Sequence, residues 1–311
     1  LLIAVLVVMI GQLDGLNAAF AGVRSESPAL LSMGNRAGIE FGITLIIAIL
    51  AANLFHQGLW QRVYAAQSES ALRTGFISAG ILVIPVVIGV GLFGLWAVGR
   101  GLVTADNASV ALFVVAMEVL PSWGVVLLMV LALVLVMSSM DTLLNGMASS
   151  VTLGLPWLRP TWRPARLLSS SRIITILLAF PAMAIATKGY SVLYLFLLAD
   201  LATAGAMVPV FLGMFSRRFT GRMALISSVT GIVVGAIFFP TPTAPYTNGW
   251  LALPALESLW DVLRTGSVLT SFLSAVVTSS AIAFVLLGIA TWRKQTVGYD
   301  FRDLARSVRL F

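Results

Sequence analysis

The chain has 311 residues, of which 59% are hydrophobic and 10% charged, and its formal net charge at pH 7 is +7. Soluble domains contain about 45–50% apolar and about 25% charged residues, so a mean hydropathy of +1.02 excludes a single buried core under a charged surface. One histidine and no cysteine also exclude a disulfide framework, thiol chemistry and a His/Cys metal cluster.

Long hydrophobic runs recur along the whole chain. Crossing about 30 Å of hydrocarbon takes ~20 residues. We expect residues 1–13 to be the end of one helix, because the chain starts inside the hydrophobic run LLIAVLVVMI without a basic leader, as a fragment of a longer protein would. Further helices are predicted at residues 39–55, 76–99, 119–150, 173–187, 189–216, 223–240 and 265–292. The sequence therefore predicts an all-α polytopic membrane protein.

Basic residues predict the orientation of these helices. When successive loops are assigned alternately to two sides, 14 of the 19 Lys and Arg residues fall on one side and 5 on the other. A missed or invented helix would scramble this split, and the positive-inside rule places the richer side in the cytoplasm. The pI of about 10.5 therefore indicates topology, and we expect no nucleic-acid partner.

Motifs of soluble enzymes find little support. GVGLFG at residues 89–94 matches a dinucleotide glycine pattern, but it sits inside a predicted span, where close helix packing by small residues is favoured. GIVVG at residues 231–235 is likewise interpreted as a packing face. No catalytic triad or phosphate loop occurs, so we expect neither an enzyme nor an organic cofactor.

The stretch VLVMSSMDTLLNGMASS, residues 134–150, carries polar groups within a predicted span. Leu135, Ser138, Ser139 and Thr142 share one helical face, and Asp141 lies beside it. Hydroxyls and a carbonyl from a loosened helical turn could collect around a hard cation. Alternatively, the hydroxyls bond the carbonyls four residues earlier and allow tight helix packing.

Three segments resemble the sodium:solute symporter family. They are NLFHQGLWQRVYAAQSESALRTGF at 53–76, MSSMDTLLNGMASS at 137–150 and LADLATAGAMVPVFLGMFSRRFTGRMAL at 198–225. The resemblance implies part of a LeuT-type bundle of two inverted five-helix repeats. The expected organisation is the end of the last helix of the first repeat (1–13), an extracellular loop (14–38), the second repeat (39–216), two peripheral membrane helices (217–292) and a cytoplasmic tail (293–311).

The resemblance also implies two kinds of ion position. The family's sodium site maps onto the hydroxyls of Ser138 and Ser139 and the backbone carbonyl of Leu135. Some members have a second ion site at the positions of Asp141 and Thr142, where they use two hydroxyls, so Asp141 departs from their pattern. Sodium is the only metal expected.

Substrate contacts are expected where the first helix of the second repeat unwinds, at about residues 52–57. Asn53, His56 and Gln57 are the candidates there, although His56 could equally be a helix-end residue at the cytoplasmic interface. Asp200 lies in the middle of a predicted span, and an unpaired acid at that depth is costly. We therefore expect Asp200 to face the solute cavity or to pair with a polar neighbour.

The resulting functional prediction is a sodium-coupled symporter that imports a small solute by alternating access, in the cell (plasma or inner) membrane. Its partners would be the solute, Na⁺ and the lipid bilayer. Two alternatives remain. One is a solute-sensing module fused to a histidine kinase, and the other is a proton-coupled symporter of the same fold in which Asp141 or Asp200 titrates.

Overall fold

The computed structural model describes residues 16–103, 108–158, 164–241, 244–249 and 268–293, together with Val7 and Gly11. The predicted helix at residues 1–13, apart from those two positions, and the predicted tail after residue 293 lie outside the described residues.

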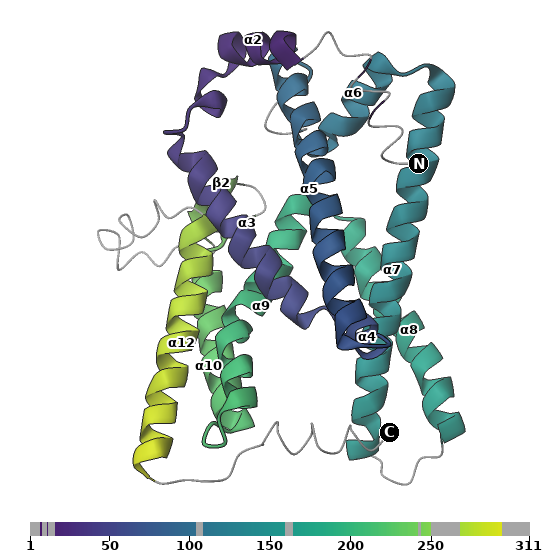
Figure 1. Ribbon diagram of the computed structural model, residues 1–311. Helices are drawn as coiled ribbons and strands as arrows, with labels where there is room; N and C mark the ends of the chain where they lie inside the picture. The colour runs from purple at the N-terminus through teal and green to yellow at the C-terminus, as the bar shows by residue number, and fades with distance from the viewer. Residues whose placement is uncertain are drawn as a thin grey trace. The chain divides into compact units, whose positions relative to one another are not determined.

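The described elements are nearly all helices (Figure 1). In chain order they are α2 (Leu16–Glu26), α3 (Arg36–Phe55), α4 (Gln57–Tyr64), α5 (Glu69–Gly99), α6 (Ala111–Val119), α7 (Ser122–Leu158), α8 (Pro164–Ala186), α9 (Val192–Phe215), α10 (Gly221–Ile237) and α12 (Val268–Trp292). Two 3₁₀ turns are η1 (Pro28–Leu31) and η2 (Ala108–Val110), and the short strands β1 (Pro240–Thr241) and β2 (Ala244–Gly249) pair antiparallel.

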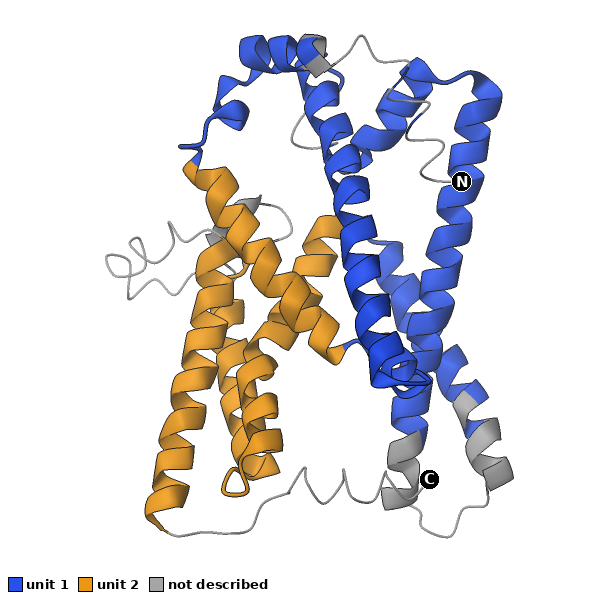
Figure 2. Ribbon diagram, in the orientation of Figure 1, with its two compact units in different colours: residues 1–35, 56–189 blue, residues 36–55, 190–311 orange. Residues whose placement is uncertain are grey.

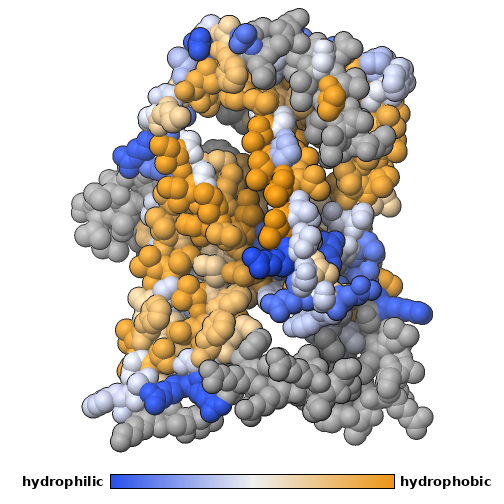
Figure 3. Space-filling model, viewed as in Figure 1, coloured by the Kyte–Doolittle hydropathy of each residue, from blue (hydrophilic) through white to orange (hydrophobic). Residues whose placement is uncertain are grey.

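Five helices in the described part of the chain are long and apolar enough to cross a membrane. They are α3, α5, α7, α9 and α12, while the apolar stretches 172–186 of α8 and 221–237 of α10 are shorter. Consecutive residues Ile81 to Ile84 of α5 are each more than half exposed, so this helix presents apolar side chains on every side. Hydrophobic residues also cover most of the visible helical surface in Figure 3. The prediction of a multi-pass helical membrane protein is confirmed.

Several helix boundaries differ from the sequence-based ranges for local reasons. Helix α5 starts at Glu69, because the Ser68 hydroxyl accepts a hydrogen bond from the Ala71 amide at 3.1 Å and caps the first turn. The helix predicted at 119–150 begins at Ser122 and runs to Leu158, because Pro121 has no amide hydrogen with which to continue α6, which ends at Val119. The segment 14–38, predicted as a loop, contains α2. Short helices such as α2 escape a search for membrane-length hydrophobic runs.

The chain folds into two compact units (Figure 2). Unit 1 contains residues 1–35 and 56–189, and unit 2 contains residues 36–55 and 190–311. Each unit has its own set of packed helices. The range 39–216, which the family resemblance assigns to the second repeat, contributes to both units.

Helices α9, α10 and α12 pack side by side in unit 2, with α3 against α9 and α12. A Cβ atom placed on Gly231 would lie 2.7 Å from the Ala275 carbonyl oxygen, so only glycine permits this approach of α10 to α12. The Ser271 hydroxyl also donates a hydrogen bond to the Gly235 carbonyl at 2.7 Å. The interpretation of GIVVG as a packing face is confirmed.

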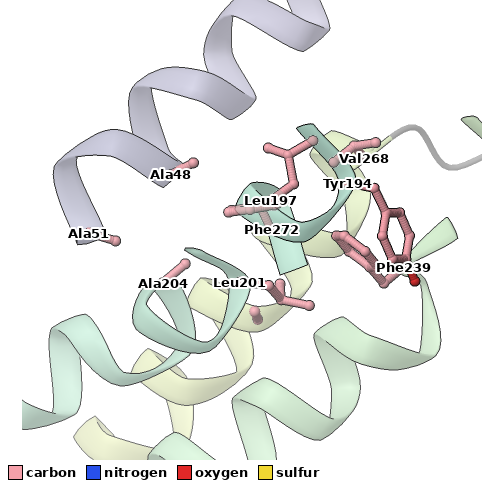
Figure 4. Packing of buried hydrophobic residues seen from close by; sticks show 10 residues of the cluster. Ala48, Ala51, Tyr194, Leu197, Leu201, Ala204, Phe239, Val268 and Phe272 are labelled. Atoms are coloured by element: carbon pink, nitrogen blue, oxygen red, sulfur yellow. The ribbon is translucent and has the colours of Figure 1, made fainter. Parts of the chain in front are cut away.

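The apolar core of unit 2 surrounds this contact. It contains Tyr194, Leu201, Phe239 and Phe272, and the rings of Tyr194 and Phe239 lie 5.6 Å apart between centroids (Figure 4). Burial of these large side chains holds the helices of unit 2 together by packing, to which the bond from Ser271 to Gly235 adds a polar contact.

GVGLFG lies within α5 of unit 1, so it is helical and cannot form a phosphate-binding loop. The close helix packing expected there is not found at these glycines in the described part of the chain. A Cβ atom placed on Gly89, Gly91 or Gly94 meets no atom within 4 Å in the described structure. These glycines therefore do not make the close approach that Gly231 makes.

Candidate functional site

The polar stripe of α7 lies in unit 1 within an unbroken helix. The Ser139 hydroxyl donates to the Leu135 carbonyl oxygen at 3.0 Å, and the Thr142 hydroxyl donates to the Ser138 carbonyl oxygen at 3.0 Å. The loosened turn that sequence reasoning expected near residue 135 is therefore not present. Hydroxyls that bond the carbonyl four residues earlier also match the alternative reading of the stripe as part of helix packing.

Two of the three predicted sodium ligands are neighbours in space. The Leu135 carbonyl oxygen and the Ser139 hydroxyl oxygen are 3.0 Å apart, close enough to contact the same small cation. The Ser138 hydroxyl is exposed within its unit and makes no hydrogen bond to another described residue. It therefore stays available as a ligand.

Asp141 lies next to this group and is exposed within unit 1. Its Oδ1 accepts a hydrogen bond at 3.1 Å from the Asn145 side-chain amide, one turn later. No described basic residue forms an ion pair with it. The charge of this carboxylate is thus not neutralised by another described side chain.

The helix break expected at residues 52–57 occurs at His56. Helix α3 ends at Phe55, His56 has an extended backbone (φ −74°, ψ 102°), and α4 begins at Gln57. The His56 Nδ1 accepts a hydrogen bond from the Leu59 amide at 3.2 Å, so His56 caps α4. This supports its alternative reading as a helix-end residue.

Helix α4 places its first residues against the polar part of α7 in unit 1. A Cβ atom on Gly58 would lie 2.9 Å from the Thr142 methyl carbon, and one on Gly146 would lie 3.3 Å from the Gln57 Cβ. The structure thus brings Gln57 close to the stretch that contains Thr142 and Asp141. Small residues at both contacts let the two backbones approach.

Asn53 and Asp200 belong to unit 2. The Asn53 side-chain amide donates to the Ile49 carbonyl at 2.8 Å within its own helix. Asp200 in α9 is only 5% exposed, and its Oδ2 has no hydrogen-bond partner among the described residues. No polar neighbour of the kind that sequence reasoning expected is found for this oxygen.

Unit 2 also contains a cavity of about 360 Å³ that sequence reasoning did not anticipate. It lies among the first turns of α3, α9 and α12, and its lining residues are Ala37, Glu40, Phe41, Thr44, Leu193, Val268 and Leu269. Glu40 was visible in the sequence as an acid at the edge of a span. Three other lining residues, Leu193, Val268 and Leu269, lie more than 150 residues away in the chain, so no local pattern could reveal the cavity.

Apolar spans, a helix interrupted at a polar residue and a hydroxyl stripe inside a span are features of a secondary transporter. The profile of the sodium:solute symporter family matches residues 2–231, and the chain belongs to this family. The resemblance found in the three sequence segments is confirmed.

Among curated proteins, the chain is 25% identical over 218 residues to the spermidine transporter DUR31 of Candida albicans (strain SC5314 / ATCC MYA-2876). The alignment covers 69% of this chain and 41% of the relative. The chain thus spans less than half the length of this relative. No solved structure matches the chain.

Proposed function

We propose that the protein is a sodium-coupled symporter that carries a small solute into the cell by alternating access. Membership of the symporter family supports the class of activity. The observation that carries the proposal is the 3.0 Å separation of the Leu135 carbonyl and Ser139 hydroxyl oxygens on a membrane helix. With the Ser138 hydroxyl, they offer the oxygen ligands that a hard cation prefers. Sodium is the coupling ion, and no organic cofactor takes part.

We further propose that the solute is an organic cation. The relative in Candida albicans is a spermidine transporter, and spermidine is a polyamine whose amines are protonated near pH 7. In this chain, Asp200 has a buried carboxylate oxygen without a described partner. A buried unpaired carboxylate is costly, and an ammonium group of the solute would relieve that cost.

The other predicted solute contacts rank below Asp200 in this proposal. Asn53 and His56 each already bond the backbone of their own helix, and Gln57 packs against Gly146. These side chains keep further polar atoms for a solute, but none of them carries the negative charge that Asp200 offers to a cation. Asp141 and Thr142 remain the proposed positions of a second ion.

Uptake of radiolabelled spermidine by the full-length protein in proteoliposomes tests the coupling. We expect an inward sodium gradient to drive accumulation, and replacement of sodium by choline at fixed pH to abolish it. If spermidine accumulates without sodium and in response to an imposed pH gradient, the coupling ion is the proton and not sodium. Absence of uptake under both gradients would contradict the transport of this cation.

A further inference from the structure

The cavity in unit 2 has one charged wall and otherwise apolar ones. Glu40 is the only charged residue among its described lining residues, and its side chain is 23% exposed. The Thr44 hydroxyl donates to the Glu40 backbone carbonyl at 2.8 Å, so it is already engaged. A ligand that fits these walls has an apolar chain and a cationic group for the carboxylate.

Arg36 forms an ion pair with the carboxylate of Glu40. Its Nε lies 2.7 Å from the Glu40 Oε1, and the Arg36 side chain is 90% exposed. An ion pair with so exposed a partner contributes little to stability, because water screens the attraction between the two charges. An ammonium group bound in the cavity would compete with Arg36 for this carboxylate.

The cavity and Asp200 share one face of α9. Leu193 lines the cavity, and Leu197 and Asp200 follow it on the same side of the helix. At 1.5 Å per residue, Asp200 lies roughly 10 Å further along α9 than Leu193. The cavity itself is at the end of α3 that follows the predicted extracellular segment 14–38. The cavity therefore lies nearer than Asp200 to the predicted extracellular segment.

We propose that this cavity is an outer binding site for an alkylammonium group, with Glu40 as its anionic ligand and Arg36 as a competing cation. The site rests on the proposed function only for the class of solute and for the side from which it enters. Its apolar walls, Phe41 and Leu193 among them, would hold the carbon chain between amines.

Two substitutions should act in opposite directions on equilibrium binding of radiolabelled spermidine to the purified full-length protein. Glu40→Gln removes the anionic ligand, and we expect the Kd to rise about tenfold or more, as loss of a charge-assisted bond does. Arg36→Gln removes the competitor, so the Kd should fall. A structural role for the ion pair would instead make both variants bind worse.

Glu118→Gln is the matched control. Glu118 pairs with Arg100 at 3.0 Å with side chains 36% and 41% exposed, lies on the same predicted side and does not line the cavity. Its Kd for spermidine should equal that of the wild type. An unchanged Kd in Glu40→Gln, or a rise in both Glu40→Gln and Arg36→Gln, would overturn the proposal.

Sodium-driven uptake in the same preparation separates this site from the transport function. Glu40→Gln should raise the KM for spermidine and leave the maximal rate and the sodium dependence unchanged, because neither the predicted ion ligands nor Asp200 is altered. Glu40-dependent binding without sodium-driven uptake in the wild type would support the site while contradicting symport. If sodium drives uptake and the KM for spermidine is the same in Glu40→Gln and the wild type, symport is supported and the outer site is contradicted.

Discussion

At the scale of single residues, the hydroxyls of α7 have two readings. The bond from Ser139 to the Leu135 carbonyl is the bond that serines make in tightly packed membrane helices, and it also holds two predicted sodium ligands together. The geometry alone is common to both readings. Only the response to sodium separates them.

Ser138→Ala and Ser139→Ala should each raise the sodium concentration for half-maximal uptake about tenfold or more. A lost bond to a charged group is worth roughly 1.5–3 kcal/mol, and each 1.4 kcal/mol is tenfold. Sodium titration of uptake, normalised to protein in the membrane, measures the effect. Ser150→Ala is the control, because the Ser150 hydroxyl bonds the Gly146 carbonyl in the same helix and is not a predicted ligand. Equal sodium dependence in the variants of Ser139 and Ser150 would show that the hydroxyls of α7 serve helix packing and do not bind sodium.

Asp200→Asn should weaken binding of the cationic solute more than it changes sodium dependence. The substitution keeps the size of a side chain that is 5% exposed and removes the charge that the solute would meet. Measured Kd values for spermidine should rise about tenfold or more. Asp141→Asn, which changes the exposed acid of unit 1, serves as the comparison and should leave the Kd for spermidine unaltered. An unaltered solute Kd in Asp200→Asn would remove Asp200 from the binding site.

At the scale of elements, helix boundaries follow short-range chemistry and helix contacts follow side-chain size. The Ser68 hydroxyl starts α5, His56 starts α4 and Pro121 separates α6 from α7. These signals are local in the sequence, but caps lie outside the apolar runs from which the spans are predicted. Contacts such as Gly231 against Ala275 depend on which helix lies opposite.

Gly231→Ala should destabilise the packing of α10 against α12. The added Cβ would come within 2.7 Å of the Ala275 carbonyl oxygen, which belongs to helix backbone and cannot rotate away. Overpacking of this kind costs about 1–3 kcal/mol. The apparent midpoint of thermal unfolding of the purified full-length protein should fall.

Gly288→Ala is the matched control for that prediction. Gly288 lies in α12, and a Cβ placed there meets no atom within 4 Å in the described structure. Alanine is a better helix former than glycine, by about 1 kcal/mol in helix interiors. Stability should therefore be unchanged or slightly higher, and a loss equal to that of Gly231→Ala would contradict the packing argument.

At the scale of the whole molecule, the charge distribution predicts which loops lie in the cytoplasm. Gln67, between α4 and α5, falls on the basic side, and Met33, in the segment before α3, falls on the other. Both positions are exposed, and the chain has no cysteine of its own. Gln67 is preferred to its neighbour Ser68, because Ser68 caps α5.

Cysteines introduced singly at these positions of the full-length protein test the orientation. An impermeant maleimide added to intact cells should label Met33→Cys and leave Gln67→Cys unlabelled until the cells are opened. The positive-inside rule places the loops that are rich in Lys and Arg, including the one with Gln67, in the cytoplasm. The reverse labelling pattern would invert the topology and place the cavity of Glu40 on the cytoplasmic side.

Composition and order along the chain determined the membrane spans, the predicted orientation and the family. Each of these depends on sums over neighbouring residues, such as hydrocarbon-length apolar runs and basic loops, so distant contacts do not alter them. The tertiary structure alone decided which polar groups have partners. It left the Asp200 Oδ2 without a partner among the described residues, packed Gln57 against Gly146 and placed Glu40 and Leu269 in the wall of one cavity. These pairings join residues far apart in the chain, and packing between helices selects them by shape, which no local pattern records.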